Sequence, residues 1–320
     1  RLVLLNRTVD LADMIARDLR QARAWGRRLE TEVGSARESH LLDGCDLVVL
    51  TLGPRLRGGQ DRRAVASDAA AMLESSGLLE GLRPLAGENE RACVLVVTNP
   101  VEVMVTWIAA KTGIPRTRLF GLGTTVESAR CSDHLARRLD VDAPSAWVHV
   151  LGEHGKGIVL PDGGRLAGMV EPSELSRGLD SARRRMLHDA ELIRRESEDI
   201  GRRVAQGICE ELRKRIGGSA QANALEWLQG ELSIALAPPA TRFAIAACVV
   251  EVARAISSDQ DRVLTLSTLP PSMFGLPPVA LSLPYAVRRG GLGRCLLHAP
   301  SAELRQVATE LHETFKAISG

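Results

Sequence analysis

The heptapeptide LGEHGKG, at residues 151–157, places a single histidine between two glycines directly after a valine-rich stretch. Imidazole titrates close to neutral pH, so His154 could take a proton from a reacting group and return it. A histidine in a loop can equally be a packing or capping residue. The flanking glycines favour a tight loop that exposes the ring, which makes His154 a candidate general acid–base catalyst.

The segment GLGTTVESAR, at residues 121–130, contributes an acidic and a basic residue three positions apart. A helix is predicted over residues 126–140, and residues three apart on a helix share a face. Glu127 could orient an imidazole and stabilise its charged form. The planar guanidinium of Arg130 could pair with a carboxylate through two hydrogen bonds. The alternative for this pair is an ion pair on the helix surface.

Alternating buried strands and helices are predicted in the first part of the chain. Apolar runs predict strands, and apolar periodicity predicts helices, at residues 2–5, 8–24, 46–52, 62–77, 93–98 and 101–112 in turn. This alternation indicates a parallel sheet with helices on both faces. Asn6, Gly53 and Asn99 follow the three strands, and ligands of such sheets bind at the carboxyl ends of the strands. We therefore expect these three residues to border one crevice.

The later part of the chain has a different pattern. The elements predicted there are strands at residues 119–121, 146–151, 263–268 and 279–287, and helices at residues 126–140, 174–216, 241–256 and 301–318. The helical region at 174–216 is long and highly charged. Residues 217–240 are predicted to form an irregular insertion.

Four segments, in this order, resemble the L-lactate and malate dehydrogenase family: TNPVEV at 98–103, GLGTTVESAR at 121–130, LGEHG at 151–155 and PPATRFAIA at 238–246. The resemblance extends over essentially the whole chain. It implies an α/β fold, with a Rossmann-type doubly wound parallel sheet followed by an α+β substrate domain. Residues 1–125, with a helix at about 241–257, would form an N-terminally incomplete dinucleotide-binding domain, and residues 126–320 the substrate domain.

The resemblance implies an oxidoreductase that interconverts an L-2-hydroxy acid and a 2-oxo acid by hydride transfer with a nicotinamide cofactor. His154 would exchange the proton of the substrate oxygen. Glu127 stands where the family usually has Asp, so its extra methylene must be absorbed if it is to orient His154. Arg62 aligns with the mobile-loop arginine that polarises the substrate carbonyl. A small shift of the alignment would give this role to a neighbouring arginine, namely Arg55, Arg57 or Arg63.

The same resemblance implies that Arg130, Asn99, Thr241 and Leu56 contact the substrate. Arg130 would hold the carboxylate, and the Asn99 amide would bond the substrate oxygen and the nicotinamide side. Leu56 stands where lactate enzymes usually carry Gln and malate enzymes Arg, so it favours a 2-oxo acid with a larger, uncharged side chain. A one-residue shift would bring an arginine to this position and favour malate and oxaloacetate instead.

The cofactor site departs most from the family pattern. The chain has no GxGxxG motif at its start, where the family binds the pyrophosphate, and its first strand aligns with the family's second strand. Asn6 replaces the acidic residue that normally holds the adenosine ribose, and it lacks the charge that favours NAD over NADP. We expect NAD, with NADP left open, and no metal. The expected cofactor-binding residues are Asn6, Thr51, Gly53, Val97 and Asn99.

A second hypothesis is a non-catalytic homologue that uses the same scaffold as a binding or assembly module. The missing glycine motif, Asn6, Glu127 and Lys156, where the family usually has Asp, support this hypothesis. The chain also starts within a strand at Arg1, which predicts that part of the domain lies upstream. A strand, a GxGxxG motif and a helix in that upstream sequence would favour the enzyme.

Composition limits the choice of partners. The chain has 41 basic and 39 acidic residues, with a formal net charge of +2, which gives no reason to expect nucleic acid or a membrane as partner. No apolar run reaches the roughly 20 residues that span a bilayer. The six cysteines form no CxxC pair and no zinc spacing, which predicts reduced thiols and a cytoplasmic location. The expected partners are a small-molecule acid and, by resemblance, further copies in a homodimer or homotetramer.

Overall fold

The computed structural model describes residues 1–6, 8–21, 30–35, 37–54, 62–87, 91–160, 172–216, 228–229 and 242–319. Two predicted site residues, Leu56 and Thr241, and nearly all of the predicted insertion at 217–240 lie outside these ranges. Within them, no helix is both long and apolar enough to cross a membrane.

The chain begins with a small parallel β-α-β unit. Strand β1 (Leu2–Asn6) pairs with β2 (Thr31–Ser35), and helix α1 (Val9–Gln21) lies between them in the sequence. Ala12 and Ala16 are the buried positions of α1, whereas Leu11 and Ile15 are exposed. The predicted helix is thus confirmed, and its larger apolar residues face outward.

A second group of parallel strands forms the base of the main sheet. β3 (Leu47–Leu50), β4 (Cys93–Val96) and β5 (Leu119–Gly121) pair in this order. All four residues of β4 are fully buried, which explains its continuous apolar sequence. The helices that follow β3 and β4 are α2 (Ala66–Ser76), α3 (Leu78–Leu82) and α4 (Val101–Thr112).

Antiparallel strands extend the same sheet beyond β5. The eight-stranded sheet has the order β3-β4-β5-β8-β9-β6-β7, and β10 pairs with β9. The added strands are β6 (Leu151–Gly152), β7 (Ile158–Val159), β8 (Arg262–Thr268), β9 (Leu281–Arg288) and β10 (Gly291–Cys295). The sheet therefore changes from parallel to antiparallel pairing at β5.

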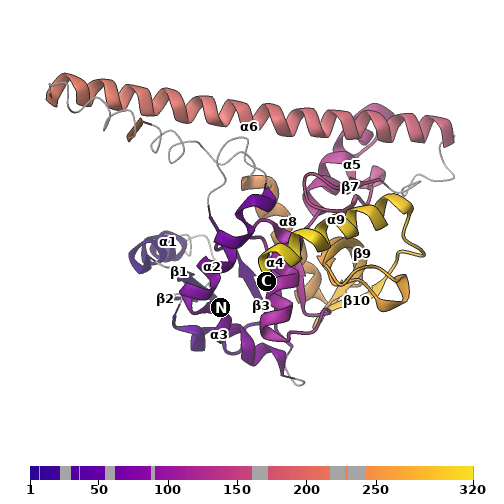
Figure 1. The fold of residues 1–320 in the computed structure, drawn as a ribbon, viewed down its shortest axis with the longest axis horizontal. Coiled ribbons are helices and arrows are strands. Elements are labelled where there is room, and N and C mark those ends of the chain that lie inside the picture. The colour runs from indigo at the N-terminus through magenta and orange to yellow at the C-terminus, as the bar shows by residue number, and fades with distance from the viewer. Residues whose placement is uncertain are drawn as a thin grey trace.

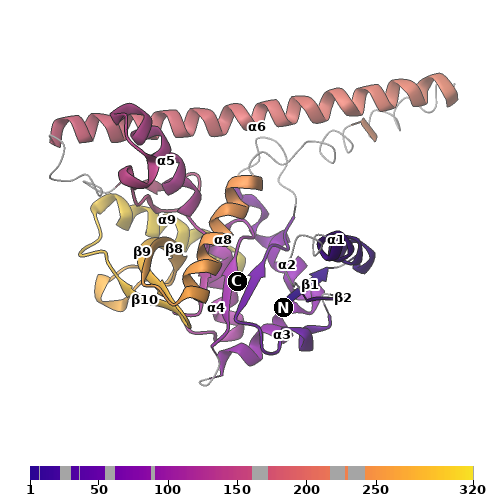
Figure 2. The same cartoon turned by 180° about the vertical axis from the view of Figure 1, so that it is seen from behind.

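Four helices accompany this second part: α5 (Thr125–Leu139), α6 (Pro172–Ile216), α8 (Arg242–Ser258) and α9 (Ala302–Ser319). Figures 1 and 2 show α6 lying across α5 and extending well past the rest of the fold. Ion pairs such as those from Arg194 to Glu191 and Glu198 lie along α6. They fit the prediction of a long charged helix.

The strand predicted at 146–151 is shorter than expected. Residues 143–146 form a 3-10 helix, and β6 contains Leu151 and Gly152 alone. Val148 and Val150 are fully buried, as a strand pattern demands. Their amides, however, donate to side-chain hydroxyls of α5 and not to a neighbouring strand. An apolar alternation cannot distinguish these two kinds of backbone partner.

Candidate active site

The centre of the candidate site is a pair formed by a histidine and a carboxylate. Nδ1 of His154 lies 2.9 Å from Oε2 of Glu127. The side chains are 13% and 5% exposed, so the pair is almost enclosed. Burial alone would raise the pKa of Glu127, but the charge and hydrogen bond of His154 outweigh it and lower the pKa. The longer side chain of Glu127 therefore reaches the imidazole, as predicted from the sequence.

Hydroxyl groups on α5 hold the segment that leads to His154. The N–H of Val148 donates to Oγ of Ser132 at 2.9 Å, and the N–H of Val150 donates to Oγ of Ser128 at 3.0 Å. The Thr124 hydroxyl, one turn earlier, donates to the carbonyl of Val150. Thr124, Ser128 and Ser132 recur at every fourth position, so their hydroxyls lie on one side of α5 and its N-terminus. These hydroxyls form the hydrogen bonds that a neighbouring strand would otherwise make with residues 148–150. The helix that carries Glu127 is thereby fixed to the segment that carries His154.

The structure explains why glycine follows His154. Gly155 has a φ of +95°, which residues with a side chain rarely adopt. A Cβ at this position would lie 2.0 Å from a guanidinium nitrogen of Arg62. That guanidinium also donates to the carbonyl of His154 at 3.4 Å. Arg62, predicted as a catalytic residue, therefore lies against the histidine loop.

A partly buried ion pair also holds the histidine loop. Arg63 donates to both carboxylate oxygens of Glu153, at 2.8 and 2.6 Å, and the two side chains are 18% and 6% exposed. Such two-pronged pairs define the relative position of both partners. From the sequence, Arg63 was expected only as a substitute for Arg62, and its pair with Glu153 was not predicted. The two adjacent arginines thus have different partners, the carbonyl of His154 and the carboxylate of Glu153.

Glu102 is a third carboxylate at this site, and the sequence analysis did not identify it. It lies in the first turn of α4 and is 1% exposed. Its Oε1 accepts the backbone N–H of His154 at 3.2 Å. Burial raises the pKa of Glu102 to about 7. Its place in the motif TNPVEV, three residues after Asn99, was the available signal.

A measurable pH dependence of stability is expected from Glu102. Between its ordinary pKa of 4.5 and about 7, the folded chain retains a proton that the unfolded chain has released. This group therefore lowers the free energy of unfolding as the pH rises through that window. Glu102→Gln cannot release the proton, so the variant should gain stability relative to wild type between about pH 5 and about pH 8. Urea denaturation of both proteins measures this difference, and a difference independent of pH would contradict the assignment.

Arg130 and Asn99 each carry a polar group that has no hydrogen-bond partner among the described residues. Arg130 is half-buried, and it makes no ion pair or hydrogen bond with any part of the chain that the structure describes. Its charge nevertheless contributes to the lowered pKa of Glu127. Oδ1 of Asn99 is buried and has no hydrogen-bond partner among the described residues. A guanidinium without a carboxylate and an amide oxygen without a donor are both suited to a ligand.

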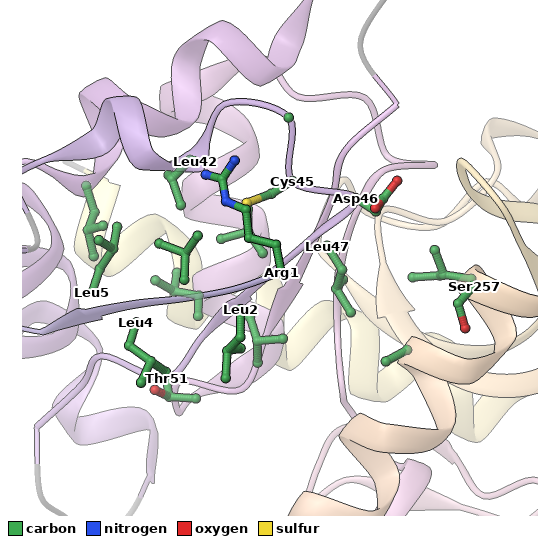
Figure 3. Close-up of a pocket in the computed structure, with 18 of the residues that line it drawn as sticks. Arg1, Leu2, Leu4, Leu5, Leu42, Cys45, Asp46, Leu47, Thr51 and Ser257 are labelled. Carbon is green, nitrogen blue, oxygen red and sulfur yellow. The ribbon is translucent and has the colours of Figure 1, made fainter. Parts of the chain in front are cut away.

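The strand ends border a cavity of about 1060 Å³ between β1 and β3. Asn6 and Gly53 line it, as predicted for a strand-end crevice, but Asn99, which was expected to border the same crevice, does not. Of the other expected cofactor-binding residues, Thr51 lines the cavity and Val97 does not. Figure 3 shows Leu2 and Leu4 of β1 and Leu47 of β3 around this cavity. β1 pairs with β2, and β3 pairs with β4, but β1 and β3 do not pair with each other.

Close packing at Gly53 explains the residue type there. A Cβ on Gly53 would lie 2.8 Å from Cγ2 of Thr98, and Thr98 in turn donates to the carbonyl of Leu52 at 2.8 Å. The Asn6 side chain accepts the N–H of Thr8 at 3.0 Å. Both strand-end residues line the cavity between β1 and β3. In the described part of the chain, no cluster of three or more His, Cys, Asp or Glu side chains could hold a metal ion.

Comparisons with known proteins agree on one family. The family model described as lactate/malate dehydrogenase, NAD binding domain, matches residues 1–121. The L-lactate dehydrogenase of Synechococcus sp. (strain JA-3-3Ab) is 30% identical over 274 residues, which cover 85% of this chain and 74% of that protein. The L-lactate dehydrogenase of Gloeobacter violaceus is 28% identical over 289 residues, which cover 86% and 73%.

Solved structures show the same fold. A lactate dehydrogenase from a Medee basin deep-sea metagenome library has a TM-score of 0.69 and 19% identity, covering 99% of this chain and 90% of that one. The malate dehydrogenase from Aeropyrum pernix has a TM-score of 0.67 and 20% identity, covering 99% and 88%. The predicted α/β fold class is confirmed.

The fold and site define an α/β protein with a buried histidine–carboxylate pair beside its main sheet. With these relatives, the chain belongs to the lactate/malate dehydrogenase family and is a lactate dehydrogenase-like oxidoreductase. The family predicted from the sequence is therefore confirmed, and the alternative of a non-catalytic homologue is not favoured.

Proposed function

We propose that this protein interconverts an L-2-hydroxy acid and a 2-oxo acid, with His154 and Glu127 as its acid–base pair. The observation that supports this most strongly is the buried contact between Nδ1 of His154 and the Glu127 carboxylate. Because Nδ1 is engaged, Nε2 is the nitrogen that exchanges a proton with the substrate oxygen. Glu127 has a lowered pKa, stays ionised at neutral pH and stabilises the imidazolium that forms when the hydroxyl proton is taken.

Arginines bind and polarise the substrate in this proposal. Arg130 holds the substrate carboxylate through two parallel hydrogen bonds, since it has no partner among the described residues. It lies three residues from Glu127 on α5, so a bound carboxylate is held next to the acid–base pair. Arg62, whose guanidinium lies against the histidine loop, polarises the C2 carbonyl of the substrate.

The residues present are compatible with a nicotinamide cofactor. The buried Oδ1 of Asn99 has no partner in the part of the chain that the structure describes, and it can accept a hydrogen bond from the carboxamide of the nicotinamide. Thr51 and Gly53 at the end of β3, Val97 after β4, and Asn6 at the end of β1 would hold the rest of the molecule. When bound, the cofactor supplies or accepts the hydride. We propose NAD, because the matching family model is that of an NAD-binding domain.

Leu56 leads to a testable expectation for the side chain of the preferred 2-oxo acid. An apolar residue at this position favours an uncharged side chain on the 2-oxo acid over a second carboxylate. We therefore expect NADH oxidation, followed by absorbance, to give a higher kcat/KM with 4-methyl-2-oxopentanoate than with pyruvate or oxaloacetate. Preference for oxaloacetate would retain the enzyme and overturn the role of Leu56. Absence of turnover with all three acids and both NADH and NADPH, in a folded protein, would support the non-catalytic homologue.

Arg130→Lys should raise the KM for the 2-oxo acid by about tenfold or more, because lysine cannot make the two-pronged contact. Steady-state kinetics at saturating NADH measure this change. Arg137→Lys is the matched control, since Arg137 lies on the same helix and forms an exposed ion pair with Asp133. An unchanged KM for Arg130→Lys would show that Arg130 does not bind the carboxylate.

Residues 1–125, with the helix at about 241–257, form the dinucleotide-binding domain in this proposal, and residues 126–320 form the substrate domain. We also propose a cytoplasmic homodimer or homotetramer. The outward apolar face of α1, with Leu11, Met14 and Ile15 exposed, supports assembly. Light scattering coupled to size-exclusion chromatography measures the oligomeric state.

A further inference from the structure

A buried carboxylate at the start of α4 has no role in the proton and hydride transfer proposed above. Glu102 is 1% exposed, and burying a carboxyl group is costly unless hydrogen bonds satisfy it. Its Oε1 receives two donors, the N–H of His154 and the hydroxyl of Ser282, each at 3.2 Å. The acid thus contacts the backbone of the catalytic histidine and not its ring.

A second link runs from the same oxygen to α5. The hydroxyl of Ser282, on β9, accepts the backbone N–H of Thr124 at 3.0 Å, and α5 begins at the next residue. Gly123 permits this approach, because its φ is +50° and a Cβ there would lie 2.1 Å from Oγ of Ser282. One carboxylate oxygen therefore connects the His154 backbone with the N-terminus of the helix that carries Glu127.

We propose that Glu102 is a positioning residue that sets the His154 ring against Glu127. The 2.9 Å contact of the pair depends on where the histidine loop and the start of α5 lie relative to each other. Glu102 contacts the loop directly and α5 through Ser282. Small displacements of catalytic groups reduce turnover strongly, so a fixed connection of this kind has a large effect.

The role requires a hydrogen-bond acceptor and not a charge. An oxygen that accepts both donors is present in ionised Glu, in protonated Glu and in the amide of Gln. The neighbouring Glu153 carboxylate is paired with Arg63, so it does not compete for the His154 N–H. Gln at position 102 should therefore preserve the connection, and Ala should remove it.

The test compares Glu102→Ala with Glu102→Gln by two measurements on the full chain. The expected effect of Glu102→Ala on turnover rests on the proposed function. The second measurement, hydrogen exchange of the His154 backbone amide, does not. We expect Glu102→Ala to lower kcat by about 10²-fold and to speed exchange at the His154 amide by about tenfold. Glu102→Gln should leave both close to wild type, with unchanged NADH affinity in both variants.

Thr106→Val is the matched control. Thr106 lies one turn further along α4, is buried, and accepts the N–H of Ala280 at 2.8 Å. The substitution removes this bond and the bond that the Thr106 hydroxyl donates to the backbone carbonyl of Glu102 at 2.8 Å, but it leaves in place both groups that donate to the Glu102 carboxylate. We expect this variant to keep wild-type kcat and wild-type exchange at His154. The Val150 amide, which is bonded to Ser128, serves as an internal reference for exchange in every variant.

Equal His154 exchange in Glu102→Ala and wild type would overturn the proposal, as would equal losses of kcat in the Ala and Gln variants. If Glu102→Ala does not fold, loss of His154 protection in Glu102→Gln would overturn it as well, and retained protection would support it. If wild type shows no turnover with any 2-oxo acid, the proposed function fails, and amide exchange alone decides the role of Glu102.

Discussion

His154→Gln is expected to lower kcat by about 10²–10⁴-fold while leaving NADH affinity nearly unchanged. Glutamine has a similar size and can still accept or donate hydrogen bonds, but its amide cannot take up a proton near neutral pH. The ring of His154 is held by Glu127 and its backbone by Glu102, so the substitution changes the chemistry more than the loop. Steady-state NADH oxidation and fluorescence titration of NADH measure the two quantities.

His149→Gln is a matched control for this variant. His149 lies in the same segment, five residues earlier, and its Nδ1 lies 2.9 Å from Oγ1 of Thr265 on β8. The control should keep turnover within a few-fold of wild type. If His154→Gln retained wild-type kcat, or if both variants lost it equally, His154 would not be the acid–base residue.

Glu127→Gln is expected to lower kcat by about 10²–10⁴-fold, with a smaller effect on the KM for the 2-oxo acid. The amide removes the charge that stabilises the imidazolium and the acceptor that fixes the tautomer of His154. Because the pKa of Glu127 is lowered, its ionised form should persist in wild type down to a pH below the ordinary range of Glu. Measurement of kcat against pH in wild type and variant tests both statements.

Two further variants define what Glu127 contributes. Glu127→Asp keeps the charge and shortens the side chain by one methylene, so it should lie between wild type and Glu127→Gln in kcat. Asp133→Asn removes a carboxylate from a more exposed position on the same helix, where it pairs with Arg137. This control should retain kcat, because exposed pairs contribute little. A Glu127→Gln variant as active as Asp133→Asn would exclude Glu127 from the acid–base pair.

Much of the fold follows from local sequence patterns. The helix predicted at 101–112 coincides with α4, and the strand predicted at 119–121 coincides with β5. These elements are predictable because their apolar residues are buried on every side and the turns at their ends are distinct. The segment at 146–151 was predicted too long, since its backbone bonds to Ser128 and Ser132 on a helix. An alternation of apolar residues does not show whether the backbone bonds to a strand or to side chains of a helix.

The candidate site was predictable in part. Glu127 and His154 were expected to meet, and the structure brings them to 2.9 Å. Glu102 and Arg63 were not assigned their contacts, because these partners lie 52 and 90 residues away in the sequence. Glu and Arg are common as exposed charged residues, so the sequence gives no reason to assign Glu102 and Arg63 a structural role. Their low exposure in the structure indicates that role. Motif spacing therefore located the His154–Glu127 pair, whereas the contacts that Glu102 and Arg63 make with the histidine loop required the three-dimensional structure.

The most direct test of the central claim follows the hydride itself. The folded protein is incubated with 4-methyl-2-oxopentanoate and NADH that carries deuterium at C4, and the product is analysed by NMR and chiral chromatography. We predict an L-2-hydroxy acid with deuterium at C2 from wild type, and none above background from His154→Gln. A product without deuterium at C2, or no product from wild type with this acid, pyruvate or oxaloacetate, would contradict the account.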